Sequence, residues 1–131
     1  MLAVMAGDKY TETRVLSATP EQLVVILYDH VLTQMQRARL AIEVGQSEPR
    51  MTALDRASKA VSELLLTLDR DRGGAIATQL DGLYGFLLGE LIDIGIHPDG
   101  ARLERLIAMV QELRDAFDAA ARARTPGAPI S

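Results

Sequence analysis

The chain has 131 residues, which suffices for one hydrophobic core but not for two, so we expect a single domain with short tails. It contains no cysteine, which excludes disulfides, a thiolate nucleophile and a cysteine-ligated metal, and which fits the cytoplasm. The formal net charge of -4 argues against a nucleic-acid partner, which needs a basic surface. No stretch approaches the roughly 20 apolar residues that cross a bilayer, so we expect no membrane insertion.

Residues 1–17 are expected to form an N-terminal arm. Tyr10, Val15 and Leu16 are isolated apolar side chains within it. They either dock on the rest of the chain or are chance apolar residues in a floppy terminus, and both alternatives stay open. The apolar start is too short for a signal-peptide core, so no targeting segment is expected.

The strongest local signal is a helix start at residues 19–22. Thr19 can act as N-cap, Pro20 falls at the first helical position, and Gln22 completes a capping box. We expect this helix over residues 20–44, ended by Gly45. Its inward stripe, at three-and-four spacing, is Leu23, Leu27, Val31, Met35, Ala38 and Ile42.

This first helix carries more apolar surface than one stripe provides. Residues 23–28 are six successive apolar or aromatic residues, which cover the whole circumference of a helix. Its second face is therefore predicted to meet the arm or a partner, through Val24, Val25, Tyr28 and Leu32.

A second helix is expected over residues 50–68. Its core stripe is Leu54, Ala57, Val61, Leu64 and Leu68, and Leu65 and Leu66 fall off that stripe. Residues 69–74 form the next turn, in which the adjacent Gly73 and Gly74 can take positive φ.

A third helix, over residues 75–94, has two neighbouring apolar stripes. The first is Ile76, Leu80, Leu83, Leu87 and Leu91, and the second is Ala77, Tyr84, Leu88 and Ile92. Gly82, Gly85 and Gly89 each cost about 1 kcal/mol relative to alanine in a helix. They permit close approach of another helix, and we attribute them to tight packing inside the fold rather than to a partner.

The fourth helix starts just after Pro98 and has the most regular stripe. That stripe is Leu103, Leu106, Val110, Leu113, Phe117 and Ala120. Residues 125–131 are expected to be a disordered tail. Four helices with short connections predict an all-α fold, an antiparallel up-down four-helix bundle over residues 18–124. The surplus apolar surface of the first and third helices is typical of a binding site.

No constellation for catalysis, cofactor binding or metal binding is found. The two histidines, His30 and His97, lack the neighbours of a di-iron or zinc motif. His30 in a bundle could indicate histidine phosphotransfer, but the lysine and glycine that such domains carry after the histidine are missing. We therefore expect no enzyme and read His30 as a half-exposed helix residue.

A set of short motifs is spread over residues 9–120. They are Lys9-Tyr10 followed by Val15, residues 18–23, Leu27-Tyr28-Asp29, Thr67-Leu68-Asp69, Gly73-Gly74 with Ile76-Ala77, Leu83-Tyr84, and residues 113–117. Together they resemble the flagellar secretion chaperone FliS family. Three features depart from that family's pattern: the apolar start at residues 1–6, Pro49 early in the second helix, and Phe117 in place of a bulkier aromatic.

The resemblance implies a cytoplasmic, non-enzymatic chaperone. Its partners would be the C-terminal segment of flagellin and the flagellar type III export apparatus, and it would prevent premature polymerisation. It implies Tyr10 as a contact, with Tyr28 and Tyr84 either contacting flagellin or closing the core edge with hydroxyls at water. The full set of predicted flagellin contacts is Tyr10, Val15, Val24, Val25, Tyr28, Leu32, Leu65, Leu66, Tyr84 and Leu88. A structural bundle that forms a homodimer through the same surface remains the alternative.

Overall fold

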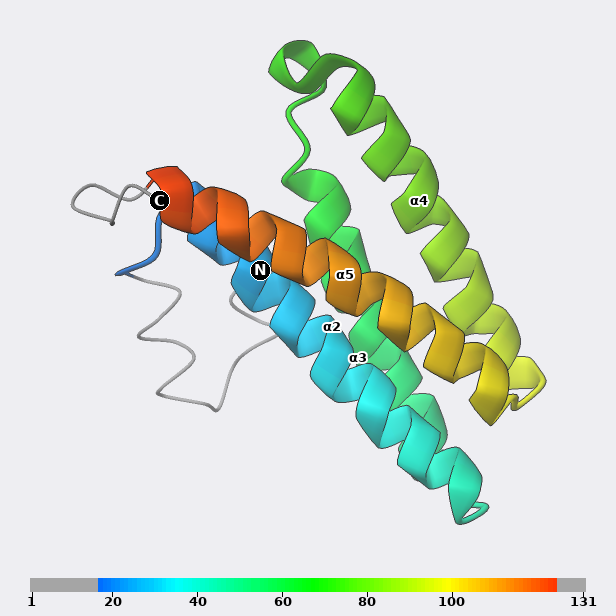
Figure 1. Cartoon of the computed structure of the whole chain (residues 1–131). Coiled ribbons are helices and arrows are strands. Elements are labelled where there is room, and N and C mark those ends of the chain that lie inside the picture. Colours follow the sequence, from blue (N-terminus) through cyan, green and yellow to red (C-terminus); the bar gives the residue numbers. More distant parts are fainter. Residues whose placement is uncertain (1–16, 125–131) are drawn as a thin grey trace.

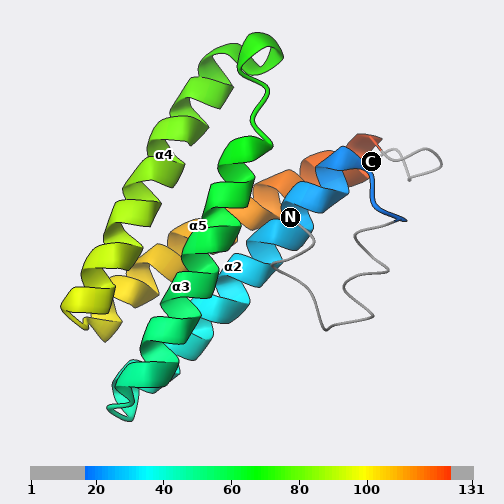
Figure 2. The same cartoon turned by 180° about the vertical axis from the view of Figure 1, so that it is seen from behind.

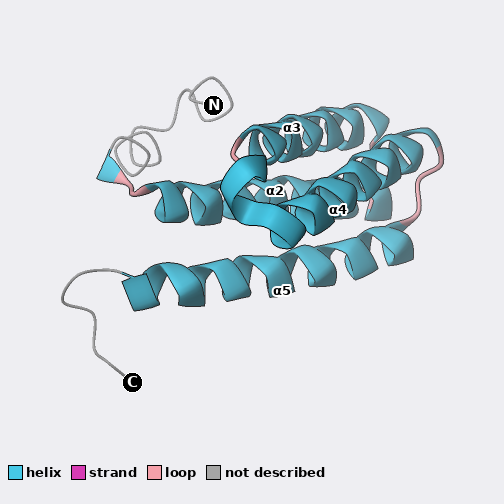
Figure 3. Cartoon of the chain, turned by 90° about the horizontal axis from the view of Figure 1, so that it is seen from above, coloured by secondary structure: helices cyan, strands magenta, loops and turns pink. Residues whose placement is uncertain are grey.

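The computed structural model describes residues 17–124, so most of the predicted arm and the whole predicted tail lie outside it. The described chain forms α2 (Pro20–Glu43), α3 (Ser47–Leu66), α4 (Arg70–Ile96) and α5 (Gly100–Arg124). Successive helices run in opposite directions (Figure 1), and every regular element of this part of the chain is a helix (Figure 3). The predicted all-α, antiparallel up-down bundle is confirmed.

The start of α2 has the predicted cap. The Gln22 backbone N–H donates to Thr19 Oγ1 at 3.2 Å, and the Thr19 N–H donates to Gln22 Oε1 at 3.0 Å. Pro20 occupies the first turn, where a missing N–H leaves no helical hydrogen bond unmade. At the other end Gly45 takes φ of 74°, as expected for a glycine terminator.

Helix α3 is shifted toward the N-terminus relative to the prediction. It begins at Ser47 rather than at residue 50, and it ends at Leu66 rather than at residue 68. Pro49 is tolerated because it lies in the first turn, where backbone N–H groups have no partner within the helix. Thr67 ends the helix, since its hydroxyl donates to the carbonyl of Leu64 at 2.7 Å.

Helix α4 contains a kink at the predicted glycine pair. Gly74 has φ of 54° and ψ of −128°, whereas Gly73 does not take a positive φ. A short helical turn therefore precedes the kink, capped by Asp69, which accepts from the Arg72 N–H at 3.1 Å. The prediction of a turn over residues 69–74 holds at the extended Asp69 and at Gly74, and it is wrong for residues 70–73, which are helical.

Helix α2 lies at the centre of the packing. It runs along both α3 and α5, and α4 packs mainly on α3. Helices α4 and α5 meet near the turn that joins them and separate toward the start of α4 (Figures 1 and 2). The core lies where α2, α3 and the middle of α4 and α5 meet. Its fully buried large side chains are Leu27, Tyr28, Val31, Met35, Val61, Leu64, Tyr84, Leu87, Leu91, Ile94, Leu103 and Val110.

Two residues of the predicted α4 stripes are exposed. Ile76 is 66% exposed because it lies in the first turn after the kink, where α4 has separated from α5. Ile92 is 61% exposed because α4 turns its opposite side toward α3. In α5 the predicted core residue Ala120 is also exposed.

Candidate functional site

The side of α4 that points away from the bundle is apolar and has little side-chain bulk. We call it the α4 glycine face, and it consists of Gly82, Gly85, Phe86, Gly89, Ile92 and Ile96. Phe86 is one of the two phenylalanines in the chain, and 53% of its surface is exposed. The spacing of three and four residues places this set on one side of the helix.

The glycines of this face do not serve packing within the described chain. A Cβ atom built on Gly82, Gly85 or Gly89 would have no neighbouring atom within 4 Å. The attribution of these glycines to tight packing inside the fold is therefore wrong. The reason is that α4 packs through its other side, with Leu87, Leu91 and other buried residues. The glycines leave the α4 backbone open to close approach from outside.

An apolar groove lies at the end of the bundle where α4 and α5 separate. We call it the N-terminal groove; its volume is about 480 Å³. It is lined by Pro20, Glu21, Leu23, Val24, Thr67, Ile76, Phe117, Ala120 and Ala121. The groove explains why Ile76 and Ala120 are exposed, and it uses Val24 from the predicted second face of α2.

The C-terminal half of α4 is tied to α5 by charged side chains. Arg102 of α5 pairs with both Glu90 and Asp93 of α4, and its Nε lies 3.1 Å from Glu90 Oε1. The hydrogen bond from Arg102 holds the pKa of Asp93 below its usual value. Arg114 of α5 binds Asp29 of α2 at 2.8 Å. The two pairs of Arg102 thus fix the C-terminal end of α4, whereas the pair of Arg114 joins α5 to α2.

Tyr28 and Tyr84 form a buried pair between α2 and α4. They are 0% and 1% exposed, and their hydroxyl groups share a hydrogen bond. The ring of Phe117 from α5 lies 5.4 Å from that of Tyr28. Burial raises the pKa of both tyrosines. The expectation that their hydroxyls face water is wrong, because each hydroxyl has the other as its partner inside the core.

The other predicted contact residues differ widely in exposure. Leu66 is 79% exposed, Leu65, Leu88 and Val24 are partly buried, and Val25 and Leu32 are buried. Tyr10 and Val15 lie outside the described residues. The role of all of these residues in binding stays a prediction. Sequence reasoning missed Phe86 and Ile96, although their spacing from the three glycines carries the signal.

The described residues offer little to the alternative chemistries. His30 is partly buried, and its Nε2 is enclosed and has no hydrogen-bond partner. A phosphorylated histidine needs an accessible ring nitrogen, so this placement does not favour phosphotransfer. Between residues 17 and 124 no group of three or more histidine and acidic side chains is placed to hold a metal ion. In that same stretch no helix has the length and apolar character needed to cross a membrane.

Comparison with known proteins assigns the family. The family model of the flagellar protein FliS matches residues 3–124. The chain belongs to the FliS family. The flagellar secretion chaperone FliS of Salmonella typhimurium is 31% identical over 81% of this chain and 79% of its own length. FliSB of Pseudomonas aeruginosa is 28% identical over 90% of this chain and 97% of its own length. FliS of Bacillus subtilis is 28% identical over 82% of this chain and 80% of its own length.

Membership of the FliS family places the chain among flagellar secretion chaperones. Two apolar features of the described chain are accessible from outside. The α4 glycine face is exposed, and the N-terminal groove is open beside it at the start of α4. The tyrosine pair between them is a structural support rather than an accessible contact.

The tyrosine pair leads to a test of how α4 is held. Tyr28→Phe leaves the Tyr84 hydroxyl buried without its partner, so we expect the free energy of unfolding to fall by about 1–3 kcal/mol. Tyr84→Phe should do the same. The double variant should lose at least about 0.5 kcal/mol less than the sum of the two, because no unpaired hydroxyl remains. Urea unfolding followed by circular dichroism measures this, and strictly additive losses would contradict the buried pair.

Proposed function

We propose that the chain is a cytoplasmic export chaperone that binds the C-terminal segment of flagellin. By covering apolar surface of that segment, it prevents premature polymerisation and aids delivery to the flagellar type III export apparatus. The observation that carries this proposal is the α4 glycine face, where three glycines open the backbone beside the exposed Phe86. Membership of a secretion chaperone family supports it further.

The α4 glycine face suits an amphipathic helix. Such a helix binds by laying its apolar side into a groove, with anchor residues three and four positions apart. The axes of packed helices lie about 8–10 Å apart, depending on the side chains between them. Glycine has no side chain, so another helix can approach α4 closely here. Phe86 provides the large exposed aromatic that often dominates the energy of an interface.

The N-terminal groove provides a second binding surface for flagellin. It lies at the start of α4, whereas the α4 glycine face covers the rest of that helix, so a long segment can occupy both. Ordering a disordered segment opposes binding, and a long contact offsets that entropy while still allowing stepwise release at export. Val24 and Leu66 are accessible for this contact without rearrangement of the described chain.

The first test places a charge on the α4 glycine face. Because Phe86 is half exposed, Phe86→Asp should leave the melting temperature nearly unchanged and raise the Kd for a synthetic flagellin C-terminal peptide by about tenfold or more. Leu40→Asp is the control, since Leu40 is 54% exposed on α2. Isothermal titration calorimetry measures both. Equal binding by the two variants would contradict this assignment.

The second test fills the face without adding charge. Gly85→Leu should raise the free energy of unfolding by about 0.5–1 kcal/mol, because leucine is a better helix former and meets no neighbour here. The same change should weaken binding of the flagellin peptide, since its side chain occupies the path of the ligand. A variant that is more stable and binds equally well would show that the peptide lies elsewhere.

The third test concerns Tyr10, whose role rests on the family resemblance. Tyr10→Ala should leave the melting temperature nearly unchanged and weaken binding of the flagellin peptide by about fivefold or more, as loss of an interface tyrosine does. Thr11→Ala is the neighbouring control. Unchanged affinity would refute the role of Tyr10.

Size-exclusion chromatography tests the dimer alternative, which predicts a dimer that persists on dilution and does not bind the peptide.

A further inference from the structure

A second groove, separate from the apolar surfaces of α4, lies along the outer seam of α2 and α3. Its volume is about 460 Å³. It is lined by Gln34, Arg37, Glu48, Pro49, Thr52, Ala53 and Arg56. We call it the α2–α3 groove. The proposed binding of flagellin to α4 makes no use of it.

The wall of this groove contains a buried amide that lacks a partner. Gln34 is 2% exposed, and its Oε1 accepts no hydrogen bond. A buried polar group without a partner lowers stability, and an amide of this kind is normally bonded by protein, by water or by a ligand. One helical turn away, the Nε2 of His30 is also enclosed and unbonded. The seam thus carries two neighbouring polar groups whose partners are not in the described chain.

Two arginines, Arg37 and Arg56, line the groove. Neither Arg37 nor Arg56 forms an ion pair within residues 17–124. Burial, and in addition the positive charges of these two arginines, holds the pKa of His30 below its usual value.

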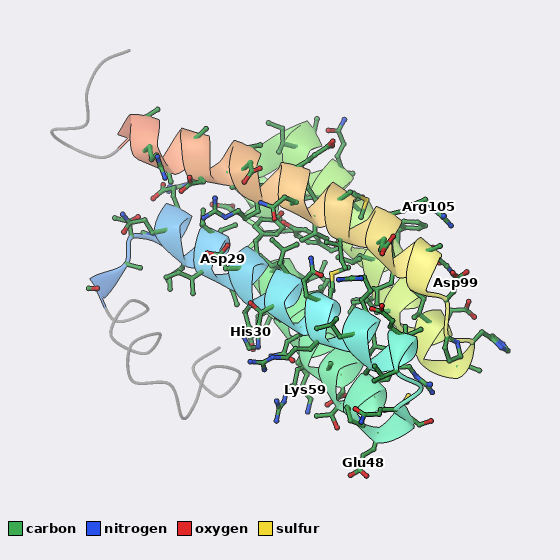
Figure 4. The ribbon with its side chains drawn as sticks, turned by 60° about the horizontal axis from the view of Figure 1, so that its bottom comes forward. Asp29, His30, Glu48, Lys59, Asp99 and Arg105 are labelled. Carbon is green, nitrogen blue, oxygen red and sulfur yellow. The ribbon has the colours of Figure 1, made fainter. Side chains whose placement is uncertain are left out.

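Other charges stand at the two ends of the groove. Glu48 lines the groove near the α2–α3 turn (Figure 4), and Lys59 lies three residues beyond Arg56 on α3. Lys59 is already paired with Asp55 at 2.9 Å, whereas the two arginines are free to bind an anion. Of the charged residues that line the groove, Arg37 and Arg56 outnumber Glu48, so the net charge of its lining is positive.

We propose that the α2–α3 groove binds an acidic peptide segment of a partner protein. Carboxylates of the segment pair with Arg37 and Arg56, and its backbone N–H groups satisfy the Gln34 amide. Pro49, Thr52 and Ala53 give the groove the apolar wall that a peptide stem contacts. A phosphate backbone has no N–H group to donate to Gln34 Oε1, whereas a peptide backbone has, so a peptide fits this groove better than a nucleic acid.

The chain's own termini do not match this chemistry. Residues 1–16 contain two acidic residues, Asp8 and Glu12, balanced by Lys9 and Arg14. Residues 125–131 contain no acidic side chain. The acidic segment therefore comes from another protein.

The experiment uses a capped peptide of alternating glutamate and alanine, about eight residues long so that it spans the groove when extended. Its control is the same peptide with glutamine in place of glutamate. We expect the acidic peptide to bind the full-length protein about tenfold more tightly than the neutral one. In the NMR spectrum, the ring protons of His30 should shift, whereas those of His97, in the exposed α4–α5 turn, should not.

Variants separate this groove from general charge effects. Arg56→Gln and Arg37→Gln should each weaken binding of the acidic peptide by about fivefold or more. Arg105→Gln removes the same charge from the exposed side of α5 and should leave binding unchanged. Equal loss in all three variants, equal binding of the two peptides, or tighter binding of a short oligonucleotide would overturn the proposal.

Gln34→Leu gives an independent readout. Removing an unsatisfied buried amide should raise the melting temperature by about 2–5 °C and weaken binding of the acidic peptide by several-fold. If Gln34 served only the fold, the melting temperature would fall and affinity would not change. All of these variants should bind the flagellin peptide normally, so failure of this proposal is distinguishable from failure of the proposed flagellin site.

Discussion

The hydrogen bond between Tyr28 and Tyr84 is the contact on which the position of α4 depends. Helix α4 has few contacts with α5, so the buried tyrosine pair and the packing on α3 hold its middle. The ion pairs of Arg102 hold its C-terminal half. Its start has no comparable attachment to α5, and the N-terminal groove opens there. The tyrosine pair, the packing on α3 and the ion pairs of Arg102 together leave apolar surface uncovered at the start of α4.

This arrangement explains how one helix serves both the core and the surface. The inward side of α4 carries leucines and Tyr84, which exclude water and stabilise the bundle. The outward side carries glycines, which contribute nothing to packing and lower helix propensity. A sequence under selection for stability alone would replace them, because better helix formers fit there without a clash. Their presence is what a surface kept open for another chain requires.

The sequence predicted the helices well and their exposed sides poorly. The cap at Thr19 and the periodic leucines depend on local spacing, so α2 and the core of α5 were predictable. Which of the two α4 stripes faces the bundle depends on how α4 lies on α3, and no local pattern contains that angle. Ile76 was therefore placed on the inward stripe although it is exposed, and Phe86 was overlooked. The tyrosine pair was missed for the same reason, since it joins residues 56 positions apart.

The two surfaces differ in the chemistry that they can recognise. The α4 glycine face consists of glycines and apolar side chains, and the neighbouring Asp93 is paired with Arg102, so the face selects for apolar area and shape. The α2–α3 groove has unpaired arginines and a buried amide. Its selectivity comes from these polar groups, because a polar group that stays buried without a partner destabilises the protein or complex. Apolar surfaces tolerate many sequences, whereas a groove of this second kind discriminates by charge. Because α2 separates the α2–α3 groove from the N-terminal groove, a bundle of this size can hold a substrate and a second partner at once.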